Sequence, residues 1–311
     1  MAEGLDVVVA GSCVMDLICR PVVLDRPIGG GALHAIEPPL AVPGGITSNA
    51  GIAMSRLGLS VGVASYVGDD AWGKLLRNTL RDEAVDTAQL RTHPEAPTST
   101  TVVLVDPVGE RSFLHAQGAP KQIDASFFLA DPDAWRGVGW LLMGYFPLMP
   151  RLLDDLPGVM RTLKQLGCKT ALDSAGGREH GGSLDALAPV LPHLDLYIPS
   201  LGEAQSQTGQ AEPGRMIERY RAAGGAGILG IKLGAEGVLL SPRPGALVHS
   251  PSTGPPGAVV DTTGAGDCFL AGMIAGLSQG LDARAAGELG CVVAAQSVTA
   301  LGGWSGVKRR A

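Results

Sequence analysis

From residue 135 onwards, short apolar segments alternate with segments of helical character, and this alternation restricts the fold more than any other feature. The apolar segments are "GWLLMGY", "KTALDS", "DLYIPS" and "GILGIKLG", at residues 139–145, 169–174, 195–200 and 227–234. Strands that alternate with helices form a mostly parallel sheet with helices covering both of its faces. The sequence therefore predicts an α/β body of this kind, with helices over residues 151–167 and 183–191 and a further helix that starts at Glu203.

The N-terminal third follows a different pattern. Two segments of alternating polarity, "TSTTVVLVD" and "RSFLHAQG", flank the turn "PVGE" and predict a hairpin. Residues 13–42 and 98–117 are expected to pair into a small separate sheet that forms a lid beside the body. Without an internal repeat, the 311 residues, 45% of them hydrophobic, are expected to form one domain over residues 1–311.

Charge and composition argue against several classes of function. The chain has 24 basic and 30 acidic residues, and its one basic cluster is the terminal "KRR", so a nucleic-acid partner is not expected. The longest apolar segment, "VGWLLMGYFPLM", is too short to span a bilayer, so no membrane partner is expected. Five cysteines without a CxxC pair indicate a reduced protein, and we expect a cytoplasmic location.

The segment "VVDTTGAGDCFLAG" at residues 259–272 contains the strongest chemical signal. Gly264, Ala265 and Gly266 lie where a loop becomes an apolar helix, so their backbone N–H groups and the helix dipole can bind an anion. Asp267 follows in the first helical turn, where a carboxylate can accept a proton from an incoming hydroxyl group. The structural alternative is a simple glycine turn with an acid that complements the dipole. Walker A and Rossmann glycine patterns do not match here.

Two motifs resemble the ribokinase family of carbohydrate and nucleoside kinases, also called the PfkB family. They are "PGGITSNAGIAMSRLG" followed by "ASYVGDDAWGKLL", and "VVDTTGAGDCFLAG". The resemblance implies a ribokinase-like three-layer α/β/α fold with a β-sheet lid, and phosphorylation of an alcohol by ATP. It also implies that Asp267 is the general base and that Gly264, Ala265 and Gly266 form the anion hole.

The resemblance extends to a substrate site near the N-terminus. Asp16 in "GSCVMD" matches the acceptor of substrate hydroxyl groups, and Gly44, Gly45 and Asn49 match the sugar-binding glycines and asparagine. Each residue type suits its role, because carboxylates and amides bind hydroxyl groups and glycines permit close approach. Two structural alternatives stay open: Asp16 as a turn residue, and Asn49 as a helix N-cap.

A nucleotide site is implied by two further segments. In "IPSLGEA", Glu203 matches an acid that organises water around Mg²⁺, although Ser200 stands where the family usually has asparagine. In "KLGAEG", Lys232 and Gly234 match residues near the ATP phosphates, with a surface lysine as the alternative. ATP and Mg²⁺ are therefore the expected cofactors.

The resemblance also implies a monovalent cation site. Many family members bind a potassium-like ion through backbone carbonyl groups, and Asp261 and Thr263 match one side of that site. The segment "SVTALGG" at residues 297–303 is expected to supply the other side. His115 on the expected lid is a candidate for substrate contact, with a half-exposed strand residue as the alternative.

Substrate identity is the least defined feature. Ile46 stands where ribokinases proper and several sugar-phosphate kinases have lysine, which favours an unphosphorylated sugar or sugar acid, with a nucleoside second. A non-catalytic ligand-binding protein of the same fold is the alternative from another class. A nicotinamide-dependent oxidoreductase is disfavoured, because no glycine fingerprint follows the first strand. The lid strands have exposed edges that can pair with those of a second chain, so a homodimer is expected.

Overall fold

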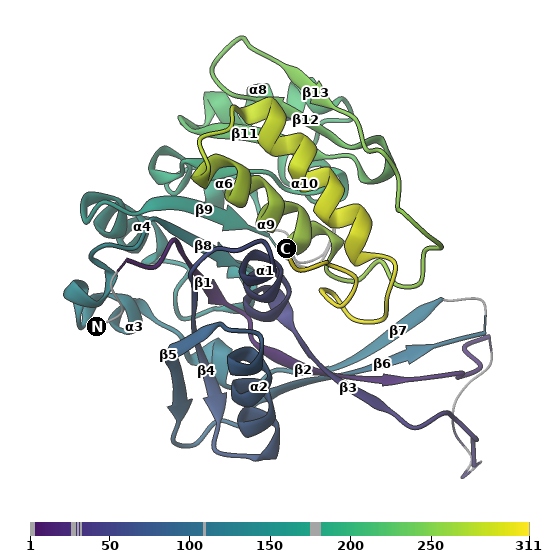
Figure 1. Cartoon of the computed structure of the whole chain (residues 1–311). Helices are drawn as coiled ribbons and strands as arrows, with labels where there is room; N and C mark the ends of the chain where they lie inside the picture. Colours follow the sequence, from purple (N-terminus) through teal and green to yellow (C-terminus); the bar gives the residue numbers. More distant parts are fainter. Residues whose placement is uncertain are drawn as a thin grey trace.

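The computed structural model describes residues 4–25, 29, 31, 33–107, 110–174 and 182–310. Within this part of the chain, a nine-stranded sheet lies between helices, and a separate four-stranded sheet projects from one side of this body (Figure 1). The predicted ribokinase-like architecture, a largely parallel sheet with helices around it and a smaller second sheet, is confirmed.

The large sheet has the strand order β13-β12-β11-β10-β9-β8-β1-β4-β5. All neighbouring strands from β11 to β5 are parallel, and only β12 and β13 are antiparallel to their neighbours. The strands are β1 (Val7–Gly11), β4 (Val61–Gly68), β5 (Asp86–His93), β8 (Trp140–Gly144), β9 (Lys169–Asp173), β10 (Leu196–Tyr197), β11 (Ile228–Lys232), β12 (Val238–Ser241) and β13 (Val248–Ser250).

Helices cover both faces of this sheet. The layer formed by α1 (Gly45–Arg56), α2 (Ala71–Asp82), α9 (Ala265–Ser278) and α10 (Ala283–Ser297) packs on one face. The opposite layer contains α3 (Ala125–Leu129), α4 (Leu156–Gln165), α6 (Leu184–Leu187), α7 (Leu201–Thr208) and α8 (Pro213–Ala222). Strand β1 shows why its segment is continuously apolar: Val7 and Val9 pack into the first layer, whereas Val8 and Ala10 pack into the second.

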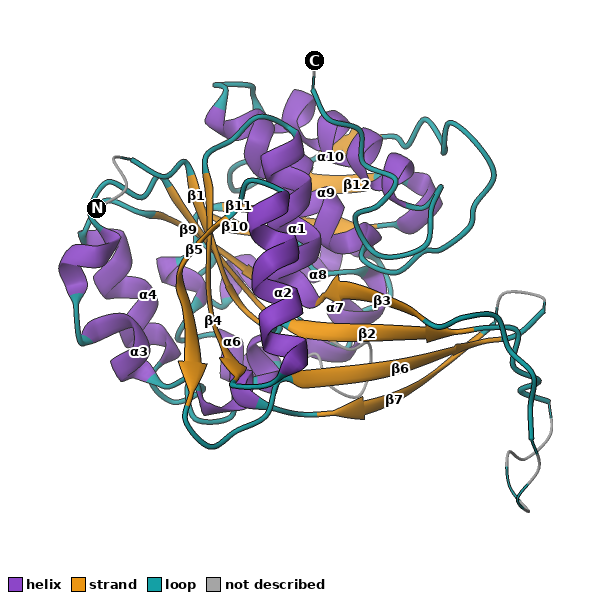
Figure 2. Cartoon of the chain, turned by 60° about the horizontal axis from the view of Figure 1, so that its bottom comes forward, coloured by secondary structure: helices purple, strands orange, loops and turns teal. Residues whose placement is uncertain are grey.

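The smaller sheet has the order β3-β2-β6-β7 and extends away from the body (Figure 2). Its strands are β2 (Val14–Cys19), β3 (Leu40–Gly44), β6 (Ser99–Val105) and β7 (Arg111–Ala116). Strands β6 and β7 form the hairpin that the alternating segments predicted. The central pair, β2 and β6, is parallel, so this sheet joins segments that are about eighty residues apart in sequence.

Several element boundaries differ from the sequence predictions. Strand β5 was not predicted, because as an edge strand it alternates exposed polar residues with few buried ones. The helix predicted over 151–167 begins only at Leu156, since Pro157 occupies its first turn. The helix predicted over 183–191 covers only Leu184–Leu187. The helix predicted to start at Glu203 begins at Leu201.

None of the helices in the described residues is both long enough and apolar enough to cross a membrane. All five cysteines are free thiols.

The carboxylate of Asp70 connects the body to the smaller sheet. It caps α2 by accepting from the N–H of Gly73 (2.8 Å), and it also accepts from the N–H (2.8 Å) and hydroxyl (2.7 Å) of Thr98. Burial raises the pKa of Asp70, but the hydrogen bonds from Thr98 and Gly73 outweigh burial and hold it below its usual value. The start of β6 is thereby attached to the first turn of α2.

Replacing this carboxylate should destabilise the protein more than removing an ordinary helix cap. We expect Asp70→Ala to lower the free energy of unfolding by about 2 kcal/mol. Asp282→Ala, which removes one cap bond to Ala285, should cost about 1 kcal/mol. Since the folded-state pKa of Asp70 is depressed, its contribution is present above the unfolded-state pKa and is lost on acidification below about pH 4. Denaturant titrations at neutral and acid pH measure both effects; equal losses for the two variants would contradict this account.

Candidate active site

The candidate residues converge at the carboxyl ends of the parallel strands. Tyr145 directly follows β8, Asp173 ends β9, Ser200 follows β10 and Lys232 ends β11. The loop before α9 reaches the same edge and brings Asp267 to it. Ligand sites of open α/β sheets lie at this edge because successive connections diverge there.

Asp267 is the buried centre of the site, with 2% of its surface exposed. Its Oδ2 atom accepts two hydrogen bonds of 2.8 Å, one from Nδ2 of Asn49 and one from the hydroxyl of Tyr145. Burial raises the pKa of the Asp267 carboxyl, and the two hydrogen bonds oppose this rise. A carboxylate of raised pKa beside a helix N-terminus is suited to accept a proton.

The N-terminus of α9, which the sequence predicted as an anion site, begins at a glycine. Gly264 is the N-cap of α9 and adopts a left-handed backbone conformation with φ of 70°. A Cβ atom here would lie 2.7 Å from Cα of Gly303 and 2.9 Å from Nδ2 of Asn49. A Cβ atom on Gly266 would lie 3.1 Å from Nζ of Lys232. Glycine at position 264 therefore lets α9 pack closely against Asn49 and Gly303, and glycine at position 266 leaves room for the side chain of Lys232.

A cavity of about 290 Å³ lies in front of this helix terminus. Gly264, Ala265, Gly266 and Asp267 form one wall, and Lys232, Gly234, Ser200 and Glu203 belong to the lining with Tyr145, Asp173, Ser174 and Thr262. The residues predicted for the anion hole, the base and the nucleotide phosphates thus share a single cavity.

Lys232 is not a surface lysine, so that alternative is wrong. Its side chain is 12% exposed, and Nζ donates to Oδ1 of Asp173 at 3.0 Å. Burial alone would lower the pKa of Lys232, but the carboxylates of Asp173 and Glu203 outweigh it and raise the pKa. Lys232 therefore presents a positive charge to the cavity. Sequence reasoning missed Asp173, although an acid at the end of a buried strand was a usable signal.

Ser200 and Glu203 form a reciprocal cap at the start of α7. The N–H of Ser200 donates to Oε2 of Glu203 at 2.8 Å, and the N–H of Glu203 donates to Oγ of Ser200 at 3.4 Å. Serine at the position where the family usually has asparagine thus has a structural function as an N-cap. The cap leaves Glu203 in the lining of the cavity.

The residues predicted for the substrate lie outside the lining of the cavity in front of α9. Asp16 on β2 and Gly44 on β3 are so close that a Cβ atom on Gly44 would lie 2.0 Å from Oδ2 of Asp16. Burial raises the pKa of Asp16 to about 7, opposed by a hydrogen bond from Thr101 and reinforced by Asp261 and Asp267.

Gly45 and Asn49 belong to α1. Gly45 has φ of 73°, and a Cβ atom there would lie 2.6 Å from the carbonyl oxygen of Ser12. Asn49 lies inside the helix, whose N-cap is Gly44, so the alternative that Asn49 caps the helix is wrong. The amide of Asn49 instead binds the predicted base.

The loop before the anion hole packs against the segment that follows α10. The N–H groups of Val260 (2.7 Å) and Asp261 (3.2 Å) donate to the carbonyl oxygen of Val298, and the N–H of Gly302 donates to Oδ2 of Asp261 at 2.9 Å. The two segments predicted to provide carbonyl groups for a monovalent cation are therefore neighbours. Whether they bind such an ion stays a prediction.

Arg111 is a residue that sequence reasoning missed. It extends from β7 of the smaller sheet, and its guanidinium forms an ion pair with Asp261 and donates to Thr263 Oγ1. No sequence signal indicated this contact, since it joins residues that are 150 positions apart.

His115, the candidate for substrate contact, lies on the same strand β7. Its Nδ1 atom lies 2.9 Å from Oγ1 of Thr101, and burial lowers the pKa of His115. Its contact with substrate stays a prediction.

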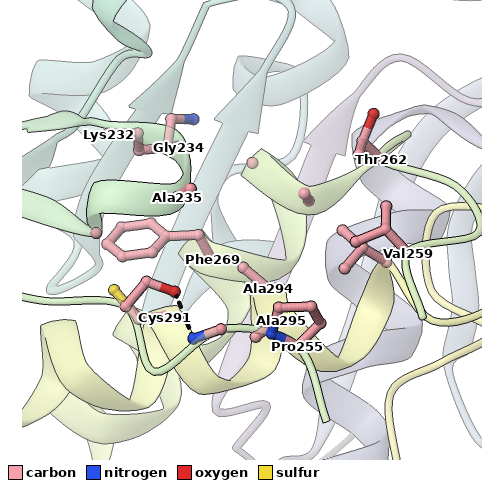
Figure 3. Close-up of a pocket in the computed structure, with 16 residues that line it drawn as sticks. Lys232, Gly234, Ala235, Pro255, Val259, Thr262, Phe269, Cys291, Ala294 and Ala295 are labelled. Atoms are coloured by element: carbon pink, nitrogen blue, oxygen red, sulfur yellow. Dashed lines mark hydrogen bonds between the residues drawn. The ribbon is translucent and has the colours of Figure 1, made fainter. Parts of the chain in front are cut away.

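A second cavity of about 320 Å³ adjoins the first and is mainly apolar (Figure 3). It shares Lys232, Gly234 and the first turn of α9 with the cavity in front of Asp267. Its other labelled lining residues are Ala235, Pro255, Val259, Thr262, Phe269, Cys291, Ala294 and Ala295. Sequence reasoning did not predict this cavity, because its walls come from two helices and two loops.

Residues 5–309 match the pfkB family carbohydrate kinase model. The chain belongs to the PfkB family. It is 30% identical over 277 residues to a fructokinase of Klebsiella pneumoniae, which covers 87% of this chain and 83% of that protein. It is 29% identical over 248 residues to an aminoimidazole riboside kinase of Salmonella typhimurium, covering 77% of this chain and 75% of that protein.

Solved structures agree with this assignment at the level of the fold. Arabidopsis thaliana ribokinase, solved with ribose and ATP, superimposes with a TM-score of 0.85 at 22% identity, covering 98% of this chain and 96% of that chain. A ribokinase from Giardia lamblia gives a TM-score of 0.82 at 21% identity, covering 99% and 97%. This PfkB protein is therefore a phosphotransferase, as the sequence predicted.

Gly264 offers a direct test of the predicted anion hole in this PfkB kinase. Gly264→Ala should lower kcat by about 10²-fold, because the new Cβ atom would displace Asn49 and the segment at Gly303. Gly280→Ala is the matched control: it has φ of 81° with no atom within 4 Å of the new Cβ. Both variants should lose about 1 kcal/mol of stability through the left-handed backbone. Steady-state kinetics and thermal unfolding separate the two effects; equal kcat values would refute the steric argument.

Proposed function

We propose that this kinase transfers the γ-phosphate of ATP to a hydroxyl group of a small sugar. The observation that carries the proposal is the buried carboxylate of Asp267 in the first turn of α9, facing one cavity together with Lys232. A base beside an anion-binding helix terminus is the arrangement that phosphoryl transfer to an alcohol requires.

In the proposed reaction, Asp267 accepts the proton of the attacking hydroxyl group. Both hydrogen bonds described above end on Oδ2, which leaves Oδ1 as the oxygen for that proton. The N–H groups at Gly264, Ala265 and Gly266 stabilise the charge on the migrating phosphoryl group. Phosphoryl transfer depends mainly on such positioning and charge stabilisation.

The apolar cavity supports the proposal that a nucleotide binds next to this site. Its walls suit a planar base, and the phosphates would then extend towards Lys232, Gly234 and the first turn of α9.

The residues of the cavity in front of α9 fit a hydrated Mg²⁺ ion. Glu203 and Asp173 line this cavity, and Mg²⁺ is usually bound by one or two carboxylates, water and phosphates. When bound, Mg²⁺ neutralises phosphate charge. A neighbour from Escherichia coli, described as a ribokinase II, was solved with ATP and Mg²⁺.

For potassium, the support is the packing of residues 260–263 against residues 298–302. The side chains of Asp261 and Thr263 are already engaged by Arg111, so the ion would be bound by main-chain carbonyl groups. This agrees with the prediction that the site uses the backbone of these residues.

The sugar is proposed to bind between Asp16 and Asp267, with Gly44, Gly45 and Asn49 around it. Ile46 supports an unphosphorylated sugar, because it is fully buried where a lysine would supply positive charge. A nucleoside is the second candidate, favoured by the similarity to an aminoimidazole riboside kinase.

We also propose that the enzyme is cytoplasmic. All five of its cysteines are free thiols, and the proposed phosphoryl donor is ATP.

The mechanism predicts that Asp267→Asn loses turnover and keeps its fold. ADP release should be measured with Mg-ATP and potassium against sugars, sugar acids and nucleosides. We expect kcat to fall by at least about 10²-fold with the substrate that the wild type accepts. Asp282→Asn, an acid at the start of α10, is the control and should keep full activity. Unchanged turnover in Asp267→Asn would rule out Asp267 as the base.

The homodimer is proposed to form through the smaller sheet. Its apolar side chains Phe113 and Leu114 are 54% and 60% exposed, and Leu40 is 46% exposed. Light scattering at micromolar concentration should give twice the mass of one chain, and Leu114→Asp should reduce it, because a charge would be buried at the interface. Leu247→Asp, equally exposed on a loop of the body, is the control. A monomeric wild type would contradict the proposal.

A further inference from the structure

Tyr145 is the second hydrogen-bond donor to the proposed base, and neither the motifs nor the family match assigns it a role. It lies directly after β8, and its hydroxyl donates to Oδ2 of Asp267 at 2.8 Å. Asn49 donates to the same oxygen at the same distance. The two donors come from different elements of the fold, and they meet on one carboxylate oxygen.

The backbone of Tyr145 is held in an unfavourable conformation. Its φ of 62° and ψ of 41° are left-handed, and among the described residues only Ala84 is another non-glycine with positive φ. For a residue with a Cβ atom, the left-handed conformation is unfavourable in free energy. It persists only where the surrounding structure enforces it. Here the N–H of Tyr145 donates to the carbonyl of Asp173 at 3.1 Å, and its carbonyl accepts from Leu148 at 2.9 Å.

The neighbouring residues fix the position of the Tyr145 ring. Gly144, the last residue of β8, has Ile46 packed against it so closely that a Cβ atom there would lie 2.0 Å from Cδ1 of Ile46. The ring of Tyr145 packs beside the same apolar cluster that contains Ile46. Packing therefore accounts for the ring, the main-chain hydrogen bonds hold the backbone, and the contact with Asp267 accounts for the hydroxyl.

The protonation of the pair defines the direction of the hydrogen bond. Burial, together with the charges of Asp267 and Asp173, raises the pKa of Tyr145 well above its usual value. The phenol therefore stays protonated and donates, and the ionised carboxylate accepts. Such a bond favours the charged form of Asp267 and opposes the rise in pKa that burial imposes.

We propose that Tyr145 is a positioning residue for catalysis: its hydroxyl and the Asn49 amide hold the Asp267 carboxylate through Oδ2 and present Oδ1 to the substrate hydroxyl. The inference rests on the proposed function of Asp267 as the base. It adds a residue that keeps the base ionised and oriented without touching the reacting atoms itself.

Tyr145→Phe removes only the hydroxyl and retains the ring, so it is the decisive variant. Because Asp267 must be ionised to accept a proton, activity is lost as pH falls through its pKa. Removing a donor raises that pKa, so the acid limb of kcat should move up by about one pH unit. On the plateau above it, kcat should fall by about 10-fold through lost orientation, with KM for ATP unchanged.

Two controls separate this role from a general loss of structure. Tyr220→Phe also removes a buried phenol, one that donates to Gln207 on α7, and it should leave the acid limb in place. Adding Tyr145→Phe to Asp267→Asn should cause no further loss of kcat, because the hydroxyl acts through the carboxylate. Thermal unfolding of each variant verifies that it is folded.

A second readout does not depend on turnover. Carbon-13 NMR titration of the Asp267 carboxyl, assigned by comparison with Asp267→Asn, should show its pKa raised by about one unit in Tyr145→Phe. An unchanged carboxyl pKa would overturn the inference whatever the kinetics show. Unchanged kcat and acid limb in Tyr145→Phe, with activity lost in Asp267→Asn, would also overturn it and leave the proposed function intact. Full turnover in Asp267→Asn would instead refute the proposed function.

Discussion

The hydrogen bond between Asn49 and Asp267 is the contact on which the rest of the site depends. It joins α1 to the first turn of α9 across 218 positions of sequence, and it partners a buried carboxylate. A buried charge without donors is costly, so the helices must approach closely enough to supply them. This explains the glycines around the amide: side chains at Gly264 or Gly303 would overlap Asn49.

The distribution of charge around Asp267 is unusual for a buried region. Asp173 and Glu203 line the same cavity, and Lys232 is paired with Asp173. A polyanionic nucleotide entering this cavity would meet more carboxylates than cations, so its binding needs the N-terminal dipole of α9 and an added metal charge. The cavity therefore suits a nucleotide that carries its cation with it, in agreement with the proposed use of Mg-ATP.

The smaller sheet contacts the loop that precedes α9. Arg111 of β7 binds Asp261 and Thr263, which lie immediately before the glycines of the proposed anion hole. Asp261 also receives the N–H of Gly302, so the smaller sheet, the loop and the segment after α10 meet on one carboxylate. Asp16 on β2 completes this arrangement beside Gly44. The position of the smaller sheet and the shape of the proposed anion hole are thus physically linked.

Local sequence patterns determined the fold class of this protein and the position of its candidate base. The alternation of apolar and helical segments predicted the parallel sheet, and "DTTGAGD" predicted a helix terminus with Asp267 in its first turn, because both signals arise within a few neighbouring residues. Tertiary structure alone decided the partners of those residues. Tyr145, Asp173 and Arg111 act through contacts 59 to 150 positions away, and sequence spacing has no bearing on such contacts. The chain specifies which groups can do chemistry locally, whereas burial and long-range packing decide which of them meet.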